Sequence, residues 1–302
     1  MKIAVTGAFS YTGKYVARLL LEKGEEVITL TNHPNRPDPF DGKVKAHPLN
    51  FANEAELIEN LRGAEVLVNT YWVRFDKGTN TQPKAVENTK ALVNAAVRAG
   101  VKRIVHISIA NPSADSPLPY YWGKAANEKA VIDSGLSYAI LRPTVLVGGG
   151  EDILINNIAF LLRRFPLFLL PGDGSYGIQP VHVVDLATLA VEAVYAKDNY
   201  VIDTVGPDSY TFKELVKLVG DTIGNKRPLV PVPPRLALFA AQIISLFVKD
   251  VVLTPEEVDG LMANLLVSRE PARGKILFKE WLRENRDNVG IRYASELKRH
   301  YQ

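Results

Sequence analysis

The sequence predicts an α/β protein built on a parallel β-sheet. Over the first 150 residues, short runs rich in β-branched residues alternate with segments of helical periodicity, which is the pattern of right-handed βαβ crossovers. A glycine stands just past four of the predicted helices, where a residue that tolerates positive φ can end a helix. The predicted strands are 2–5, 26–30, 44–48, 66–69, 103–108 and 138–142, the predicted helices are 14–23, 54–61, 84–99 and 126–134, and the glycines are Gly24, Gly63, Gly100 and Gly135.

Beyond residue 150 the alternation loosens and predicts a smaller C-terminal α/β lobe. We expect a sheet domain over 1–150 and a substrate or partner lobe over 151–302 that is partly interleaved with the sheet. Thr211 is followed three residues later by Glu214, the spacing of a capping box at a helix start. The predicted elements of this half are helices 153–164, 211–223 and one headed by Asp185, and strands 179–183 and 199–204.

Composition excludes several classes of site. The 302 residues include 36 Lys and Arg against 33 Asp and Glu, so the formal net charge of +3 provides no concentrated field for nucleic acid. The absence of cysteine excludes disulfides, thiolate metal sites and cysteine nucleophiles. Because residues 2–5 already form a predicted strand that runs into a glycine turn, we expect no signal peptide and a cytoplasmic protein.

A glycine turn joins the first strand to the first helix, where a phosphate-binding turn must lie. Gly7 can take the tight turn, and Gly13 allows the helix to pack closely on the strand. Ser10 replaces the middle glycine of the usual pattern. The placement predicts a Rossmann-type doubly wound sheet, although a purely structural turn is the alternative. The dinucleotide's pyrophosphate would lie over Gly7, Phe9, Ser10, Tyr11, Thr12 and Gly13.

The end of the second strand bears on the choice between NAD and NADP. An acid about 20 residues past the turn would bind the adenosine ribose of NAD, but no acid occurs here before Asp38. Asn32, His33 and Arg36 stand in its place, and a guanidinium matches phosphate oxygens with two hydrogen bonds. The sequence slightly favours NADP over NAD, with a solvated loop arginine as the alternative.

Tyr120 and Lys124 have the spacing of neighbours on one helix face. A lysine near a tyrosine favours the phenolate, so the phenol could act as a general acid or base on a carbonyl or a carbinol. This spacing also arises by chance. Its position after strand 103–108, in a unit with a dinucleotide turn, favours the catalytic interpretation.

Together these segments resemble the extended and atypical short-chain dehydrogenase/reductase superfamily. The likeness is greatest to the NAD-dependent epimerase/dehydratase-like branch that includes the nucleotide-binding accessory subunit of respiratory complex I, and it covers almost the whole chain. The segments that resemble the family are Thr6 to Gly13, Gly100 to Ser108, Tyr120-x-x-x-Lys124, Leu141-Arg142-Pro143-Thr144 and Gln179 to Asp185.

The resemblance implies roles for these residues. Tyr120 and Lys124 would be the catalytic pair, with Lys124 also holding the nicotinamide ribose. The usual sugar-epimerase serine falls near 109–110, so Ser108, or Ser113 if the loop folds back, would replace it. The remaining cofactor groove would be formed by Asn69, Thr70, Pro143, Thr144, Leu49 and Asn50.

Two functions follow from this resemblance. The first is an NAD(P)-dependent oxidoreductase or nucleotide-sugar-modifying enzyme that uses the tyrosine and lysine on a small-molecule substrate. The second is a non-catalytic dinucleotide-binding sensor or assembly factor. His182 and Asp185 at a strand-to-helix junction, and His106 inside an apolar strand, are interpreted as structural, and no His, Asp and Glu set has metal-ligand spacing.

An apolar segment in the C-terminal half suggests a surface contact. Residues 236–248 are apolar nearly all round but too short to span a bilayer. A helix of this kind must be covered, and packing within the C-terminal lobe is the simplest interpretation. A homodimer contact or peripheral membrane docking through 235–252 is the alternative. Arg163 and Arg164 beside the apolar run 165–170 add a reason to test membrane contact.

Overall fold

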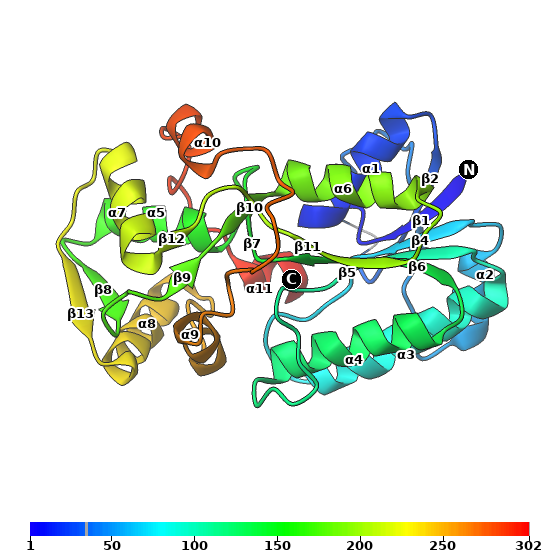
Figure 1. Ribbon diagram of the computed structural model, residues 1–302, viewed down its shortest axis with the longest axis horizontal. Helices are drawn as coiled ribbons and strands as arrows, with labels where there is room; N and C mark the ends of the chain where they lie inside the picture. Colours follow the sequence, from blue (N-terminus) through cyan, green and yellow to red (C-terminus); the bar gives the residue numbers. More distant parts are fainter. Residues whose placement is uncertain (34–35, 302) are drawn as a thin grey trace. The chain divides into compact units, whose positions relative to one another are not determined.

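The computed structural model describes residues 1–33 and 36–301. The chain forms two compact units (Figure 1). Unit 1 consists of Met1–Pro143 together with Val184–Thr204, and unit 2 consists of Thr144–Val183 together with the chain from Val205 onward. Each unit has its own buried apolar core. The chain therefore leaves unit 1 after Pro143 and returns to it for one helix and one strand.

Unit 1 is built on a seven-stranded parallel sheet with strand order β11-β6-β5-β4-β1-β2-β3. The order reverses between β1 and β4, and in open α/β sheets ligands bind at the carboxyl ends of the strands at such a reversal. The α/β class and the Rossmann-type sheet predicted from the sequence are confirmed. The strands are β1 (Lys2–Thr6), β2 (Glu26–Thr31), β3 (Lys45–Pro48), β4 (Val66–Asn69), β5 (Arg103–Ile107), β6 (Ser137–Pro143) and β11 (Tyr200–Thr204).

Helices cover both faces of this sheet. Figure 1 shows α3 and α4 on one face and α1 and α6 on the other. The sheet is hydrophobic on both sides, as a doubly covered parallel sheet requires, and residues such as Ile3, Leu67 and Ile104 are fully buried. The helices are α1 (Tyr11–Glu22), α2 (Glu54–Leu61), α3 (Gln82–Ala99), α4 (Pro119–Asp133) and α6 (Val183–Tyr195).

The expected start of α4 at Ala126 is wrong, because the helix begins at Pro119. Proline is favoured in the first turn of a helix, since its fixed φ fits and its missing N–H is not needed there. The aromatic residues that follow Pro119 show no clear apolar periodicity, which hid the first two turns from the sequence pattern. Tyr120 and Lys124 are therefore both inside the helix.

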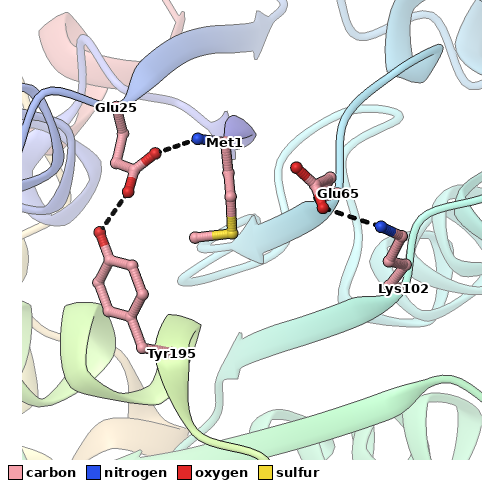
Figure 2. Close-up of polar contacts among 5 residues, drawn as sticks. All are labelled: Met1, Glu25, Glu65, Lys102 and Tyr195. Carbon is pink, nitrogen blue, oxygen red and sulfur yellow. Dashed lines mark hydrogen bonds and ion pairs between the residues drawn. The ribbon is translucent and has the colours of Figure 1, made fainter.

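Side-chain contacts fix α6 and β5 to the neighbouring strands (Figure 2). The Tyr195 hydroxyl at the end of α6 donates to the Glu25 carboxylate at 2.8 Å, and the Met1 nitrogen contacts the other oxygen of Glu25. Lys102 Nζ, just before β5, lies 2.9 Å from the carboxylate of Glu65, just before β4. These contacts lie at the amino ends of the strands, away from the carboxyl ends where ligands bind in sheets of this kind.

Unit 2 contains three small sheets and a set of helices around its own core. Phe278, Trp281 and Leu282 are buried there with α5 and α7. The predicted capping box at Thr211 and Glu214 is confirmed at the start of α7. The strand pairs are β7 (Val145–Val147) with β10 (Pro180–His182), β9 (Gly177–Ile178) with β12 (Tyr210–Thr211) and β8 (Phe168–Pro171) with β13 (Leu229–Val232). The helices are α5 (Leu154–Arg164), α7 (Phe212–Thr222), α8 (Pro234–Val248), α9 (Pro255–Met262), α10 (Phe278–Glu284) and α11 (Glu296–Tyr301).

The simplest interpretation of the sequence was that the apolar helix α8 is covered within the C-terminal lobe. In the structure most of α8 is not covered. Among its residues only Ala237 and Ala241 are buried, whereas Leu246 and Phe247 are 78% and 81% exposed. Its buried residues are small and its most exposed residues are large and apolar, an arrangement that overall hydrophobicity does not indicate. Within residues 1–33 and 36–301, no helix is both long enough and apolar enough to cross a membrane.

Candidate functional site

The glycine turn after β1 is closed by contacts that only glycine permits. Gly7 has φ +66°, a conformation that other residues rarely adopt, and its carbonyl accepts a hydrogen bond from Ser10 N at 2.8 Å. A Cβ on Gly13 would lie 2.3 Å from the Gly7 oxygen. The first turn of α1 therefore packs directly on the end of β1. Both predicted glycines occupy positions where a side chain would open the turn.

The amino end of α1 lies at the glycine turn and has no side-chain cap. Its N-cap residue, Ser10, makes no side-chain capping hydrogen bond, and no acidic residue occurs in the first turn. The first N–H groups of a helix have no partner within the helix and carry partial positive charge. Phe9, Tyr11 and Thr12 are half-buried around this end. The arrangement is suited to an anionic group such as a pyrophosphate.

The structure brings Arg36 to the glycine turn. Its Nη1 donates to Ser10 Oγ at 2.7 Å, so the guanidinium lies beside the helix start. His33 is half-buried, and its main-chain N–H donates to Thr31 Oγ1, while Asn32 is exposed. The region at the end of β2 therefore presents cationic and neutral groups, and no carboxylate follows β2 directly. The nearest acid, Asp38, accepts from two main-chain N–H groups of its own loop.

Buried polar side chains line the carboxyl ends of β1, β4 and β5. Thr6 Oγ1 donates to Asn69 Oδ1 at 3.1 Å, and Asn69 Nδ2 lies 3.1 Å from His106 Nδ1. Because Tyr71 N–H also donates to Asn69 Oδ1 at 3.1 Å, the amide nitrogen faces the imidazole and donates to Nδ1, which places the proton of the neutral ring on Nε2. Burial, together with the charge of Lys124, lowers the pKa of His106 to about 3. Thr70 Oγ1 donates to the Thr6 carbonyl at 2.6 Å and closes the row.

Leu49 and Asn50 were expected near the adenine. The first is buried and the second is exposed. Leu49 is 5% exposed and belongs to the core of unit 1. Asn50 is exposed, and its amide donates to Glu56 at 2.8 Å. Next to them the ring of Phe51 lies 4.8 Å from the ring of Tyr71, centroid to centroid. The structure therefore provides an aromatic pair at this place, which the sequence did not indicate.

Tyr120 and Lys124 both contact Trp72, a residue that the sequence did not indicate. The Trp72 ring makes an edge contact with Tyr120 at 5.7 Å between centroids, and Lys124 Nζ lies 5.0 Å from the Trp72 ring. A Cβ on Gly123 would lie 2.5 Å from the indole, so glycine makes room for it. Trp72 follows the carboxyl end of β4. This position after a strand was the only feature of the sequence that could have indicated a place in the site.

Ser108 directly follows the residue that Lys124 contacts. Lys124 Nζ donates to the Ile107 carbonyl at 3.0 Å, directly before Ser108. The Ser108 side chain is buried, and its hydroxyl has no hydrogen-bond partner among the described residues. Ser113, the other candidate, is exposed, and its hydroxyl accepts from Asp115 N within its own loop. Unsatisfied buried hydroxyls are uncommon and mark places where a water or ligand group can bind.

The environment of Lys124 changes its protonation. Lys124 is 3% exposed, and this burial lowers the pKa of its ammonium to about 7, while the nearby charge of Glu128 acts in the opposite direction. Glu128 is itself held by Arg142, whose Nε and Nη2 donate to the two carboxylate oxygens at 2.9 and 2.6 Å. The ammonium can therefore lose its proton near neutral pH.

Other predicted residues belong to different parts of the fold. Pro143 ends β6, and its carbonyl accepts from Ala110 N at 2.8 Å, whereas Thr144 begins unit 2 and its hydroxyl contacts the Gln179 carbonyl. His182 is buried in unit 2 with its ring 5.8 Å from Trp281. Among the residues that the structure describes, no group of three or more His, Cys, Asp or Glu side chains could hold a metal ion.

Comparison with known proteins agrees with this geometry. Residues 7–155 match the profile of a family described as NAD(P)H-binding. Residues 7–155 therefore belong to this NAD(P)H-binding family. The chain is similar to the mitochondrial NADH dehydrogenase [ubiquinone] 1 alpha subcomplex subunit 9 of Arabidopsis thaliana. The two are 25% identical over 284 residues, which cover 87% of this chain and 70% of the plant protein.

Two solved structures have the same fold as this protein. An NADPH-dependent quinone oxidoreductase of Escherichia coli, complexed with NADPH, superposes with a TM-score of 0.71 and 21% identity, over 88% of this chain and 91% of that one. A UDP-glucose 4-epimerase of Thermus thermophilus, in complex with NAD, gives a TM-score of 0.70 and 20% identity, over 96% and 99%. The profile match covers the glycine turn, both candidate serines and the Tyr120–Lys124 pair of this NAD(P)H-binding protein.

A further buried group of this family member was not predicted. Asn127, one helical turn beyond Lys124 in α4, is completely buried, and neither atom of its amide has a partner among the described residues. The same holds for His106 Nε2 and Thr89 Oγ1. Buried polar atoms of this kind are normally satisfied by ordered water. Single residues of this type carry no sequence signal, since an asparagine in a helix is more often exposed.

Proposed function

We propose that the protein is an NAD(P)H-dependent enzyme that exchanges a hydride and a proton with a carbonyl or hydroxyl carbon of a small molecule. Quinones and nucleotide sugars are the substrate classes to test first. The observation that supports this most strongly is the cluster of Tyr120, Lys124 and Ser108, in which both helix residues contact Trp72 and the lysine is anchored beside the serine.

Each side chain of the cluster has a definite task in this proposal. The Tyr120 hydroxyl exchanges a proton with the substrate oxygen. In its protonated form Lys124 stabilises the Tyr120 phenolate, and it supplies hydrogen bonds to the nicotinamide ribose. The free Ser108 hydroxyl binds the substrate oxygen and orients it toward Tyr120. The dinucleotide, when bound, supplies or accepts the hydride.

The dinucleotide would lie along the carboxyl ends of β1 and β4 in unit 1. Gly7, Gly13 and the uncapped start of α1 fit its pyrophosphate. Arg36 lies beside the same helix start, and a guanidinium suits a 2′-phosphate, so we propose NADP rather than NAD as the preferred cofactor.

A second candidate function is dinucleotide binding without turnover, as a sensor or assembly factor. The burial of Lys124 against the Trp72 ring favours it, because an indole in this place competes with a ribose for the ammonium. The similarity to a protein named as a subunit of an NADH dehydrogenase is consistent with this candidate. Under this hypothesis the cofactor serves as structural filling or as a signal.

The two candidates are separated by a matched pair of tyrosine variants. Tyr120→Phe removes only the hydroxyl, so an enzyme should keep its affinity for NADPH and lose about 100-fold or more in kcat. Tyr138→Phe, on strand β6 of the same unit, is the control and should change neither quantity. Substrates are a panel of quinones, nucleotide sugars and aromatic carbonyls, with NADPH oxidation followed by absorbance.

Three outcomes are informative. Loss of turnover in Tyr120→Phe alone supports the enzyme. Turnover that survives Tyr120→Phe contradicts the proposed role of this tyrosine. Retention of NAD or NADP by the purified protein, detected by mass spectrometry after denaturation, with no turnover of any panel member by the parent protein, supports the second candidate instead.

A further inference from the structure

The outward side of α8 is a continuous apolar surface in unit 2. Its first four members recur at intervals of three or four, and the fifth lies four residues after the third, so all share one side of the helix. We call this set of five side chains the α8 face. Its members, with their exposed fractions, are Leu236 (48%), Phe239 (59%), Ile243 (43%), Leu246 (78%) and Phe247 (81%).

The opposite side of α8 explains why this face points outward. Ala237 and Ala241 are its buried residues, and the helix packs against β8. Small side chains let the helix lie close to the strand, and Leu238, Ile244 and Val248 are half-buried beside them. Large apolar groups in water cost free energy in proportion to their area, and contiguous exposed patches usually mark a binding surface. The α8 face is therefore a surface for an apolar partner.

The charges at the ends of α8 indicate which partner fits. The helix contains no acidic residue, and exposed Arg235 and Lys249 stand at its two ends. The next residue, Asp250, is turned inward, where its carboxylate accepts from the main-chain N–H groups of Glu296 and Leu297. The apolar face is thus bordered at both ends by cations, and basic side chains near a membrane surface are attracted to anionic lipid.

Of the uncharged polar residues of α8, Gln242 is exposed and Ser245 is half-buried. The Ser245 hydroxyl donates to the Ala241 carbonyl at 2.8 Å and accepts from Val252 N at 3.1 Å, so it is satisfied within unit 2. Protein interfaces normally surround an apolar centre with a rim of hydrogen-bonding groups. The 15 residues of α8 are too few to span a bilayer. The helix is suited to lying parallel to a membrane.

We propose that α8 docks unit 2 on the surface of an anionic lipid bilayer. The α8 face enters the boundary between headgroups and acyl chains, and Arg235 and Lys249 contact lipid phosphates. Two cations and one short helix give weak and reversible binding that decreases as salt is added. This proposal is independent of the proposed enzymatic activity.

Vesicle co-sedimentation tests the proposal on the full chain. We expect binding to phosphatidylcholine vesicles that contain phosphatidylglycerol, and little binding to phosphatidylcholine alone. The double variant Leu246→Ser with Phe247→Ser should weaken binding about 10-fold or more, because it removes the most exposed apolar groups. Val97→Ser, an exposed apolar residue on α3 of unit 1, is the matched control and should bind like the parent.

The charges are tested separately from the apolar face. Arg235→Gln with Lys249→Gln should remove most of the preference for anionic vesicles and most of the salt dependence. Equal binding of the parent protein to both kinds of vesicle would overturn the anionic specificity. Unchanged binding of the Leu246→Ser, Phe247→Ser variant would overturn the assignment of the face. A dimer that dissociates in that variant, without vesicle binding by the parent, would show that a second copy covers α8.

Discussion

The ammonium of Lys124 lies 5.0 Å from the centroid of the Trp72 ring, and this contact encloses the one lysine that the sequence singles out for chemistry. A cation over an aromatic face is attracted by the ring quadrupole, but the same ring removes water from it. The pKa of Lys124 falls to about 7 because desolvation is the larger effect. Trp72, in the loop after β4, therefore affects the protonation state of the Lys124 side chain in α4.

The pH dependence of stability tests this burial. In the unfolded chain Lys124 keeps its proton up to about pH 10.5, whereas in the folded protein it loses it near pH 7. Between these values the unfolded state binds more protons, so the free energy of unfolding rises with pH across this window. The stability cost of the buried charge is complete below pH 7 and disappears toward pH 10.5.

Lys124→Met removes this cost. The free energy of unfolding of the variant, minus that of the parent protein, should be larger at pH 6 than at pH 9 by on the order of 2 kcal/mol. Lys129→Met, exposed on the same helix, should show no such change with pH. Urea unfolding at the two pH values measures both. A stability difference for Lys124→Met that is the same at pH 6 and pH 9 would contradict the burial of its charge.

Gly13→Ala tests the glycine turn. The new Cβ would lie 2.3 Å from the Gly7 oxygen, so the start of α1 must move away from β1. We expect NADPH affinity to fall at least about 10-fold, because the helix N–H groups lose their placement. Gly24→Asn is the control: a Cβ there meets nothing within 4 Å, and asparagine tolerates its positive φ. Calorimetric titration, with circular dichroism to verify folding, decides between a local and a global effect.

Arg36→Ala tests the choice of cofactor. The Arg36 guanidinium is held at Ser10 beside the helix start, so its removal should weaken NADP by about 1 to 3 kcal/mol and leave NAD nearly unchanged. Arg62→Ala, an exposed arginine paired with Glu59, should affect neither cofactor. Titration of both dinucleotides against each variant gives the comparison. Equal losses for NAD and NADP in Arg36→Ala would mean that this side chain does not distinguish the 2′-phosphate.

Much of unit 1 could be predicted because its determinants are local. The alternation of strands and helices follows from hydrophobic periodicity, and the ends of helices follow from glycines with positive φ, as at Gly100. Gly7 and Gly13 are recognisable because a tight turn and a close approach admit no other residue. Tyr120 and Lys124 were found by their spacing along one helix, although the start of that helix was misplaced.

The rest depended on contacts between residues far apart in the chain. Trp72 lies in a loop without periodicity, and only the folded chain shows that it reaches Gly123 and Lys124. The row from Thr6 through Asn69 to His106 depends on the register of three strands. Register and strand order are not encoded in any short segment, because they result from the packing of the whole sheet.

The sequence by itself determined the α/β class, the parallel sheet, the glycine turn and the residue types that could serve a dinucleotide, since each rests on local conformation and periodicity. Only the tertiary structure decided that Lys124 is buried against Trp72, that Arg36 reaches Ser10, and that α8 exposes five large apolar side chains. Burial, pKa and exposure are properties of the surroundings of a side chain, and those surroundings are assembled from segments distant in sequence.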